Sequence, residues 1–181
     1  MILQHTKAGG RTVAYWIFIF NQREIATIDE AALIQAVTAS NYATLSAQYG
    51  LDPHLIAPAL AHLKVVTSER AACPFFLLRY LPEPQQPLAF YQWDGHSEIG
   101  SSLLKEALDG CESEEIRRRL AQTRQINAIE LSALQLQDMG LLLAYELARW
   151  SADQGEGVLR GIDGNWYRLN RHQAFIRLHL E

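Results

Sequence analysis

Short runs of β-branched and aromatic residues, separated by polar or turn-forming residues, predict several β-strands along this chain. The first run, 12–20, is apolar at almost every position and predicts a strand that is covered on both faces. Asn21 and Gln22 would then turn the chain into a second strand at 23–28, which gives an N-terminal β-hairpin. Further extended segments are predicted at 64–68, 74–80, 88–93 and 126–131.

Apolar residues spaced three and four apart predict helices in the middle of the chain. Asp29 is placed to cap the first of them, whose apolar side carries Ala32, Leu33, Ala36 and Val37. A second helix at 42–49 should end at Gly50, and Asp52-Pro53 should start a third that runs to about residue 63. Two more helices are predicted at 99–108 and 113–123.

The longest predicted helix starts at Leu131-Ser132 and ends near Gln154-Gly155. Its middle, 139–145, is apolar on nearly all sides, which is typical of a helix inside the core. We therefore expect buried side chains at Leu142, Leu143, Tyr145 and Leu147.

Three strands are predicted after this helix, at 158–162, 165–169 and 174–178. Asp163-Gly164 fits a type I′ turn between the first two, so the three strands should form an antiparallel meander. The whole chain, 1–181, is then a single α+β domain: an N-terminal β-hairpin, a helical middle with one long buried helix, and a C-terminal three-stranded antiparallel meander. We expect a flexible arm or an edge strand at 1–11 and a stiff proline-rich loop at 81–87.

Composition narrows the classes of function. Hydrophobic residues make up 49% of the chain, enough for a packed core, and no apolar run is long enough to cross a bilayer. The net charge of −4 argues against a dedicated nucleic-acid binder. Cys73 and Cys111 lie too far apart for a zinc or redox motif, and we expect two reduced thiols. These features predict a cytoplasmic protein with no membrane contact and no cofactor.

Asp94, His96 and Glu98 form the most metal-like local cluster. Alternate residues of an extended segment point the same way, so three oxygen and nitrogen ligands could converge there. The same residues also suit a polar turn followed by the start of a helix, which is the interpretation that we prefer. An enzyme with a dispersed site near Asp94 and His96 is an alternative function.

Residues 42–62 resemble a helix-turn-helix, with apolar Leu45 and Tyr49 and with Gly50 in the turn. The would-be recognition helix has no Arg, Lys, Asn or Gln to contact base edges, and Pro58 should interrupt it. A DNA-binding regulator is therefore a second alternative. We predict no measurable affinity for duplex DNA at physiological salt.

Aromatic residues and arginines crowd the C-terminal strands, the combination that is enriched at binding hot spots. They are Trp166, Arg168, Arg171, Phe175 and Arg177. Inward aromatics and outward arginines in a structural sheet would give the same pattern. Because strand residues alternate, Trp166 and Arg168 should share one side of their strand. Our hypothesis is a protein-binding module, for example an inhibitor or immunity-type protein, in which Arg168 and Arg177 contact an acidic patch on a partner.

Overall fold

The computed structural model describes residues 13–68, 75–82 and 86–178, and in them eight strands form one antiparallel sheet. The strands are β1 (Ala14–Asn21), β2 (Lys64–Ser68), β3 (Phe75–Arg79), β4 (Leu88–Asp94), β5 (Gln125–Ser132), β6 (Val158–Arg160), β7 (Trp166–Leu169) and β8 (Phe175–Arg177). The helices are α1 (Glu30–Thr38), α2 (Tyr42–Tyr49), α3 (Ile56–His62), α4 (Glu98–Asp109), α5 (Glu114–Leu120) and α6 (Met139–Gly155), with 3₁₀ turns η1 (Pro53–Leu55) and η2 (Leu134–Gln137). The mixed helix-and-sheet class is confirmed. The predicted arm at 1–11, Cys73 and the middle of the proline-rich loop lie outside the described residues.

The strand order is β2-β3-β4-β5-β1-β6-β7-β8, so β1 lies inside the sheet. It pairs along its whole length with β5, from Ala14 opposite Ser132 to Asn21 opposite Gln125, and its other edge pairs with β6. The predicted cover on both faces of β1 is met on one face only. Ile17 and Ile19 are buried in the first core cluster, whereas Trp16 and Phe18 on the other face are partly exposed.

The predicted N-terminal hairpin is wrong, because residues 23–28 form no strand. They run past the end of the sheet and bond elsewhere: the Arg23 amide donates to the Gly155 carbonyl, and the Ile25 amide donates to the side chain of Gln125. The long pairing of β1 with β5 replaces the short local hairpin that the turn residues suggested.

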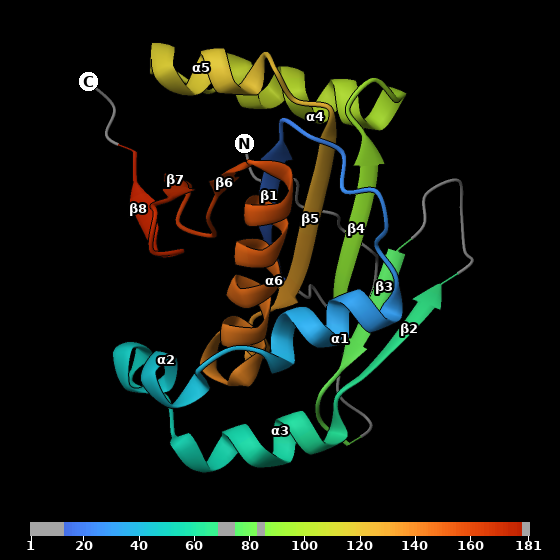
Figure 1. Ribbon diagram of the computed structural model, residues 1–181, viewed down its shortest axis with the longest axis vertical. Helices are drawn as coiled ribbons and strands as arrows, with labels where there is room; N and C mark the ends of the chain where they lie inside the picture. Colours follow the sequence, from blue (N-terminus) through green and yellow to red (C-terminus); the bar gives the residue numbers. More distant parts are fainter. Residues whose placement is uncertain (1–12, 69–74, 83–85, 179–181) are drawn as a thin grey trace.

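One face of the sheet packs against α6 and α1, with α2 and α3 at one end of this layer (Figure 1). The first core cluster lies between these helices and the sheet. Leu142, Leu143 and Leu147 are buried as predicted, whereas Tyr145 is half-buried and lies edge-on to Phe175.

The long helix starts later than predicted. Residues 131–132 belong to β5, η2 follows, and α6 begins only at Met139. Asp138 provides the start signal, since its carboxylate accepts hydrogen bonds from the Gly140 amide and the Tyr80 hydroxyl. The apolar run through 126–131 therefore continues a strand and does not open a helix.

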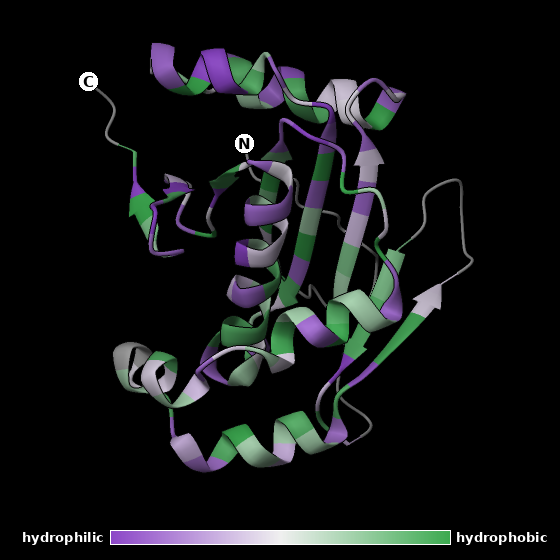
Figure 2. Cartoon of the chain, viewed as in Figure 1, coloured by the Kyte–Doolittle hydropathy of each residue, from purple (hydrophilic) through white to green (hydrophobic). Residues whose placement is uncertain are grey.

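A second core cluster lies on the opposite face, where α4 and α5 cover only one end of the sheet (Figure 1). Phe20, Ile126, Val158 and Trp166 come from the strands, and Cys111, Ile116 and Leu120 come from the helical side. Hydrophobic residues run along β1 and β5, whereas α5 is largely hydrophilic on the surface in view (Figure 2).

The last three strands pair consecutively, β6 with β7 and β7 with β8. Between β6 and β7, Gly164 alone has a positive φ, 76°, so the predicted type I′ turn is wrong. The Asp163 carboxylate instead accepts hydrogen bonds from the Asn165 amide and the Tyr167 hydroxyl, which favours a turn with one left-handed residue.

Candidate functional site

The sheet face opposite α6 and α1 carries partly exposed aromatic side chains from three strands. We call this group the aromatic face: Trp16, Phe18, Phe75, Tyr91 and Trp93. Its members are brought together by register, since Tyr91 lies opposite Ala128 and Ala128 lies opposite Phe18. Trp16, Phe75 and Tyr91 belong to neither of the two core clusters. Among the described helices, only α4 and α5 approach this face, at its Trp93 and Phe18 end.

The rings of the aromatic face stack on one another. The ring of Tyr91 lies 5.4 Å from that of Trp93 with planes 2° apart, and 5.3 Å from that of Phe75 with planes 25° apart. Trp16 stacks in the same way on Phe18, at 5.8 Å and 14°. Offset stacking is the arrangement that aromatic pairs favour, and it turns the ring faces toward each other. The group is therefore held rigidly by its own contacts.

A carboxylate lies within this apolar row. Glu130 of β5 is opposite Trp16 on one side and Ala89 on the other, and it is half-buried. The Tyr91 hydroxyl donates a hydrogen bond of 2.8 Å to Glu130 Oε2. This bond fixes the outer edge of the Tyr91 ring as well as the carboxylate.

Two arginines on the same sheet face border the aromatic face. Arg160 of β6 lies opposite Phe18, and its guanidinium carbon is 5.9 Å from the centre of the Trp166 ring. Arg168 of β7 lies opposite Val158, so its side chain projects to the same face. Both are half-buried, and neither makes an ion pair or hydrogen bond through its side chain with the described residues.

The structure separates the five residues that the sequence grouped at the C-terminus. Trp166 and Arg168 do share one side of β7, as predicted, but Trp166 is 5% exposed and packs on Phe20 inside the second core cluster. Arg177 lies opposite Tyr167, hence on the other sheet face.

The other two members of the predicted group are also away from Arg168. Phe175 packs against Tyr145 and Tyr167 on the α6 side of the sheet. Arg171 lies in the turn between β7 and β8 and bonds to His172. Only Arg168 of the predicted group therefore projects beside the aromatic face.

The Asp94-His96-Glu98 segment forms a turn that leads into α4. Asp94 Oδ1 accepts a hydrogen bond of 2.7 Å from the His96 amide, and Ser97 caps the helix by accepting from the Gly100 amide. All three candidate ligands are exposed, and the described residues contain no group of three or more His, Cys, Asp or Glu placed to hold a metal ion. The geometry matches the turn and helix start that we preferred.

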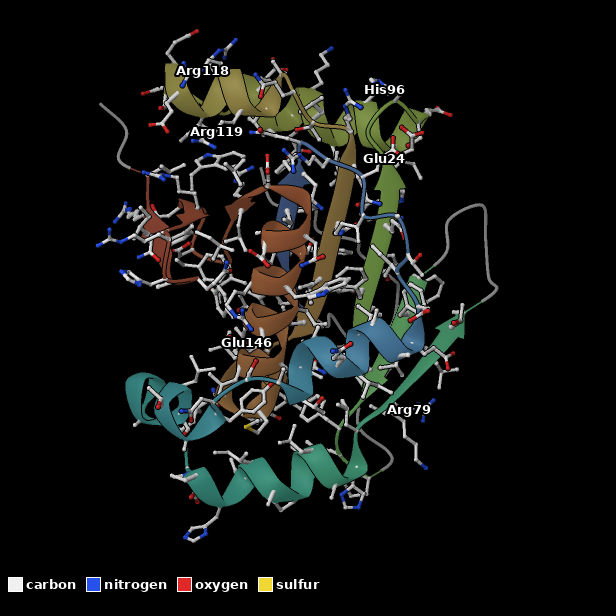
Figure 3. The ribbon with its side chains drawn as sticks, in the orientation of Figure 1. Glu24, Arg79, His96, Arg118, Arg119 and Glu146 are labelled. Atoms are coloured by element: carbon white, nitrogen blue, oxygen red, sulfur yellow. The ribbon has the colours of Figure 1, made fainter. Side chains whose placement is uncertain are left out.

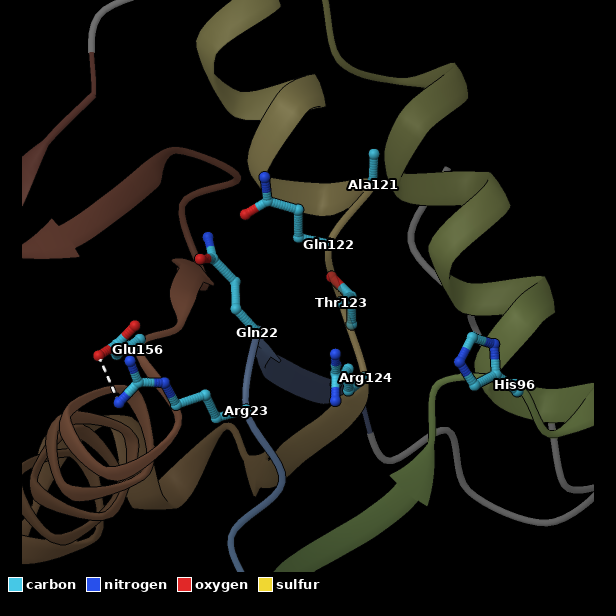
Figure 4. Close-up of a pocket in the computed structure, with 8 residues that line it drawn as sticks. All are labelled: Gln22, Arg23, His96, Ala121, Gln122, Thr123, Arg124 and Glu156. Carbon is cyan, nitrogen blue, oxygen red and sulfur yellow. Dashed lines mark ion pairs between the residues drawn. The ribbon is translucent and has the colours of Figure 1, made fainter.

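An open hollow of about 570 Å³ lies where β1 and α6 end and β5 begins (Figure 4). Arg23 and Glu156 form an ion pair of 2.8 Å on one side of it, and His96 stands on the other side. The lining residues are Gln22, Arg23, His96, Ala121, Gln122, Thr123, Arg124 and Glu156. Asp94 and Cys111 are not among them, and Cys111 is 4% exposed in the second core cluster. The hollow therefore does not assemble the dispersed site that we considered.

The helical corner at 42–62 has the predicted caps: Gly50 adopts a φ of 67°, and Asp52 accepts a hydrogen bond from the His54 amide. Pro58 does not interrupt the second helix, because it is the third residue of α3, where its missing amide hydrogen is not needed. Leu45, Leu51, Ile56 and Leu60 pack against the first core cluster. Packing alone accounts for this corner.

Within the described residues, no helix has both the length and the apolar character needed to cross a bilayer. No protein-family model, no curated protein and no solved structure matches the chain.

Proposed function

We propose that this chain is a protein-binding module whose partner docks on the aromatic face. The observation that carries the proposal is the cluster of Trp16, Phe75 and Tyr91, which stack on their neighbours yet stay outside both core clusters. Trp and Tyr are the residues that most often dominate binding energy at protein interfaces. Because these rings are already ordered on a sheet, little side-chain entropy would be lost on docking.

Ring orientation favours a protein partner over a nucleic acid. Stacking of a base needs a free ring face, whereas the rings here are turned toward one another. The Glu130 carboxylate in the middle of the row would also repel a phosphate backbone. A largely apolar protein surface with polar groups at its rim would meet neither obstacle.

Within this class we favour an inhibitor or immunity-type protein, which acts by covering part of its partner. Such a role needs a rigid, preformed surface and no pocket for a small substrate. The aromatic face is such a surface, because the four paired strands β3, β4, β5 and β1 hold it from below and ring stacking holds it from the side.

Site-specific photocrosslinking in the native host tests the proposal. A photoreactive phenylalanine at Tyr91 or Trp16 should form an adduct with one partner protein, identified by mass spectrometry. The matched control is the same residue at Leu55 of η1, an apolar side chain that is 40% exposed and lies in the helical corner. Adducts from Leu55 but from neither position on the aromatic face would refute the proposal.

A further inference from the structure

Within the described part of the chain, the two arginines beside the aromatic face lack acidic partners, although Asp and Glu outnumber Lys and Arg in the sequence by 20 to 16. Other arginines of the described residues do have acidic partners: Arg23 bonds to Glu156, Arg119 to Glu115 and Arg149 to Glu146. Among the described residues, the guanidinium of Arg160 lies over the Trp166 ring and has no carboxylate partner, and Nε of Arg168 has no acceptor.

Arg168 is the more informative of the two. Its Nε is buried and has no hydrogen-bond partner in residues 13–68, 75–82 and 86–178, which is costly for a charged donor. A buried unpaired donor of this kind calls for an explanation. Nε itself is enclosed, so an acceptor from outside the chain would bind the guanidinium through its two outer nitrogens, which are not among the buried unpaired atoms. A guanidinium presents its donors in a planar fork that a carboxylate fits with two parallel bonds.

We propose that the docking partner presents an Asp or Glu side chain to Arg160 and Arg168, next to apolar surface that covers Trp16 and Phe18. The inference rests on the proposed function. Charge complementarity carries it: pairing of β6 with β7 fixes both guanidinium groups on the face where the rings lie, and neither is neutralised within the described chain. An apolar centre with a charged pair at its edge is the usual anatomy of a specific interface.

A displayed library of random peptides, selected on the immobilised full-length protein, provides the probe. Selected peptides should combine aromatic or aliphatic residues with Asp or Glu. The same selection on the Arg160→Gln/Arg168→Gln double variant should keep the apolar residues and lose the acidic enrichment. The matched control is Arg171→Gln/Arg177→Gln, which also removes two charges but lies away from the aromatic face.

A synthetic copy of the best peptide then measures the coupling. Changing its acidic residue to the amide should weaken binding to the wild type about tenfold or more, and should have little further effect on the Arg160→Gln/Arg168→Gln variant. Thermal unfolding of each variant shows whether the fold is kept. A conservative Arg168→Lys change gives a second folded variant, which keeps the positive charge but loses the planar arrangement of N–H donors.

The outcomes separate the two proposals. If Trp16→Ala abolishes binding while the arginine variants select the same acidic peptides as the wild type, the inference fails and the proposed function stands. If Trp16→Ala leaves peptide binding unchanged, both the proposed function and the inference fail. A selection that returns only neutral or basic peptides also overturns the inference.

Discussion

Glu146 and Arg149 should respond very differently to removal, although they are partners in one ion pair. Glu146 Oε2 lies 2.7 Å from Arg149 Nη2 and also accepts a hydrogen bond from the Ser40 hydroxyl. Figure 3 shows Glu146 on α6, where the chain between α1 and α2 passes. The carboxylate side chain is only 7% exposed, whereas the guanidinium side chain is 28% exposed. The pKa of nearby Tyr42 is raised, first by burial of its hydroxyl and second by the negative charge of Glu146.

The exposed fractions of the two side chains set the expected loss in the free energy of unfolding for each variant. In the Arg149→Met variant the carboxylate stays buried and loses its counter-charge, which should cost about 3–5 kcal/mol in the free energy of unfolding. In the Glu146→Leu variant the remaining guanidinium can reach water, so we expect about 1–2 kcal/mol. The double variant should cost less than Arg149→Met alone, since it buries no unpaired charge.

Urea unfolding at neutral pH measures all three variants, provided that the slope of the free energy against denaturant is unchanged. The exposed i,i+4 pair of Glu115 and Arg119 on α5 is the control, and either single change there should cost under about 0.5 kcal/mol. The reasoning is refuted if Glu146→Leu costs as much as Arg149→Met, because the difference in burial would then have no energetic effect.

Three further predictions follow from other parts of the molecule. Leu143→Ala should cost about 2–5 kcal/mol in urea unfolding, because the side chain is fully buried on α6; a loss below about 0.5 kcal/mol would contradict its central position. Burial alone would raise the pKa of Asp163, but hydrogen bonds from Tyr167 and Asn165 outweigh it and lower the pKa. The ionised carboxylate therefore stabilises the fold above about pH 4. Asp163→Ala should lower the free energy of unfolding by under about 1 kcal/mol at this exposed site, and this loss should shrink as pH falls through the lowered pKa. A loss that grows in acid would contradict the lowered pKa. In a Cys73→Ser background, Cys111 should react with a thiol reagent only as fast as the protein opens, and immediate labelling would show that its burial is wrong.

Features that depend on neighbouring residues could be predicted from the sequence. The bounds of α2 agree at 42–49, and the capping roles of Asp29 and Asp52 are confirmed, because a cap is decided within four residues. Pairing between distant strands could not be predicted in this way. The partner of β1 lies in β5, and an apolar strand pattern carries no information about which distant strand it will meet.

For the same reason, the sequence could not predict the aromatic face. Aromatic residues at 16, 18 and 20 alternate with Ile17 and Ile19, so both faces of β1 have apolar side chains and the sequence cannot say which stays open. That choice is made by α6, which packs on the side of Ile17 and Ile19. For the C-terminal strands, alternation within β7 was predicted correctly, but the register of β8 against β7 puts Arg177 on the opposite face from Arg168.

The interior position of β1 has a consequence for biosynthesis. Its main partner strand follows roughly a hundred residues later, so a ribosome making about 5–20 residues per second needs on the order of 5–20 s to supply it. During that interval the nascent chain exposes the run from Tyr15 to Phe20, which is apolar and has two unpaired edges. We expect chaperones to bind this segment first, and folding to be limited by closure of this long-range strand pair.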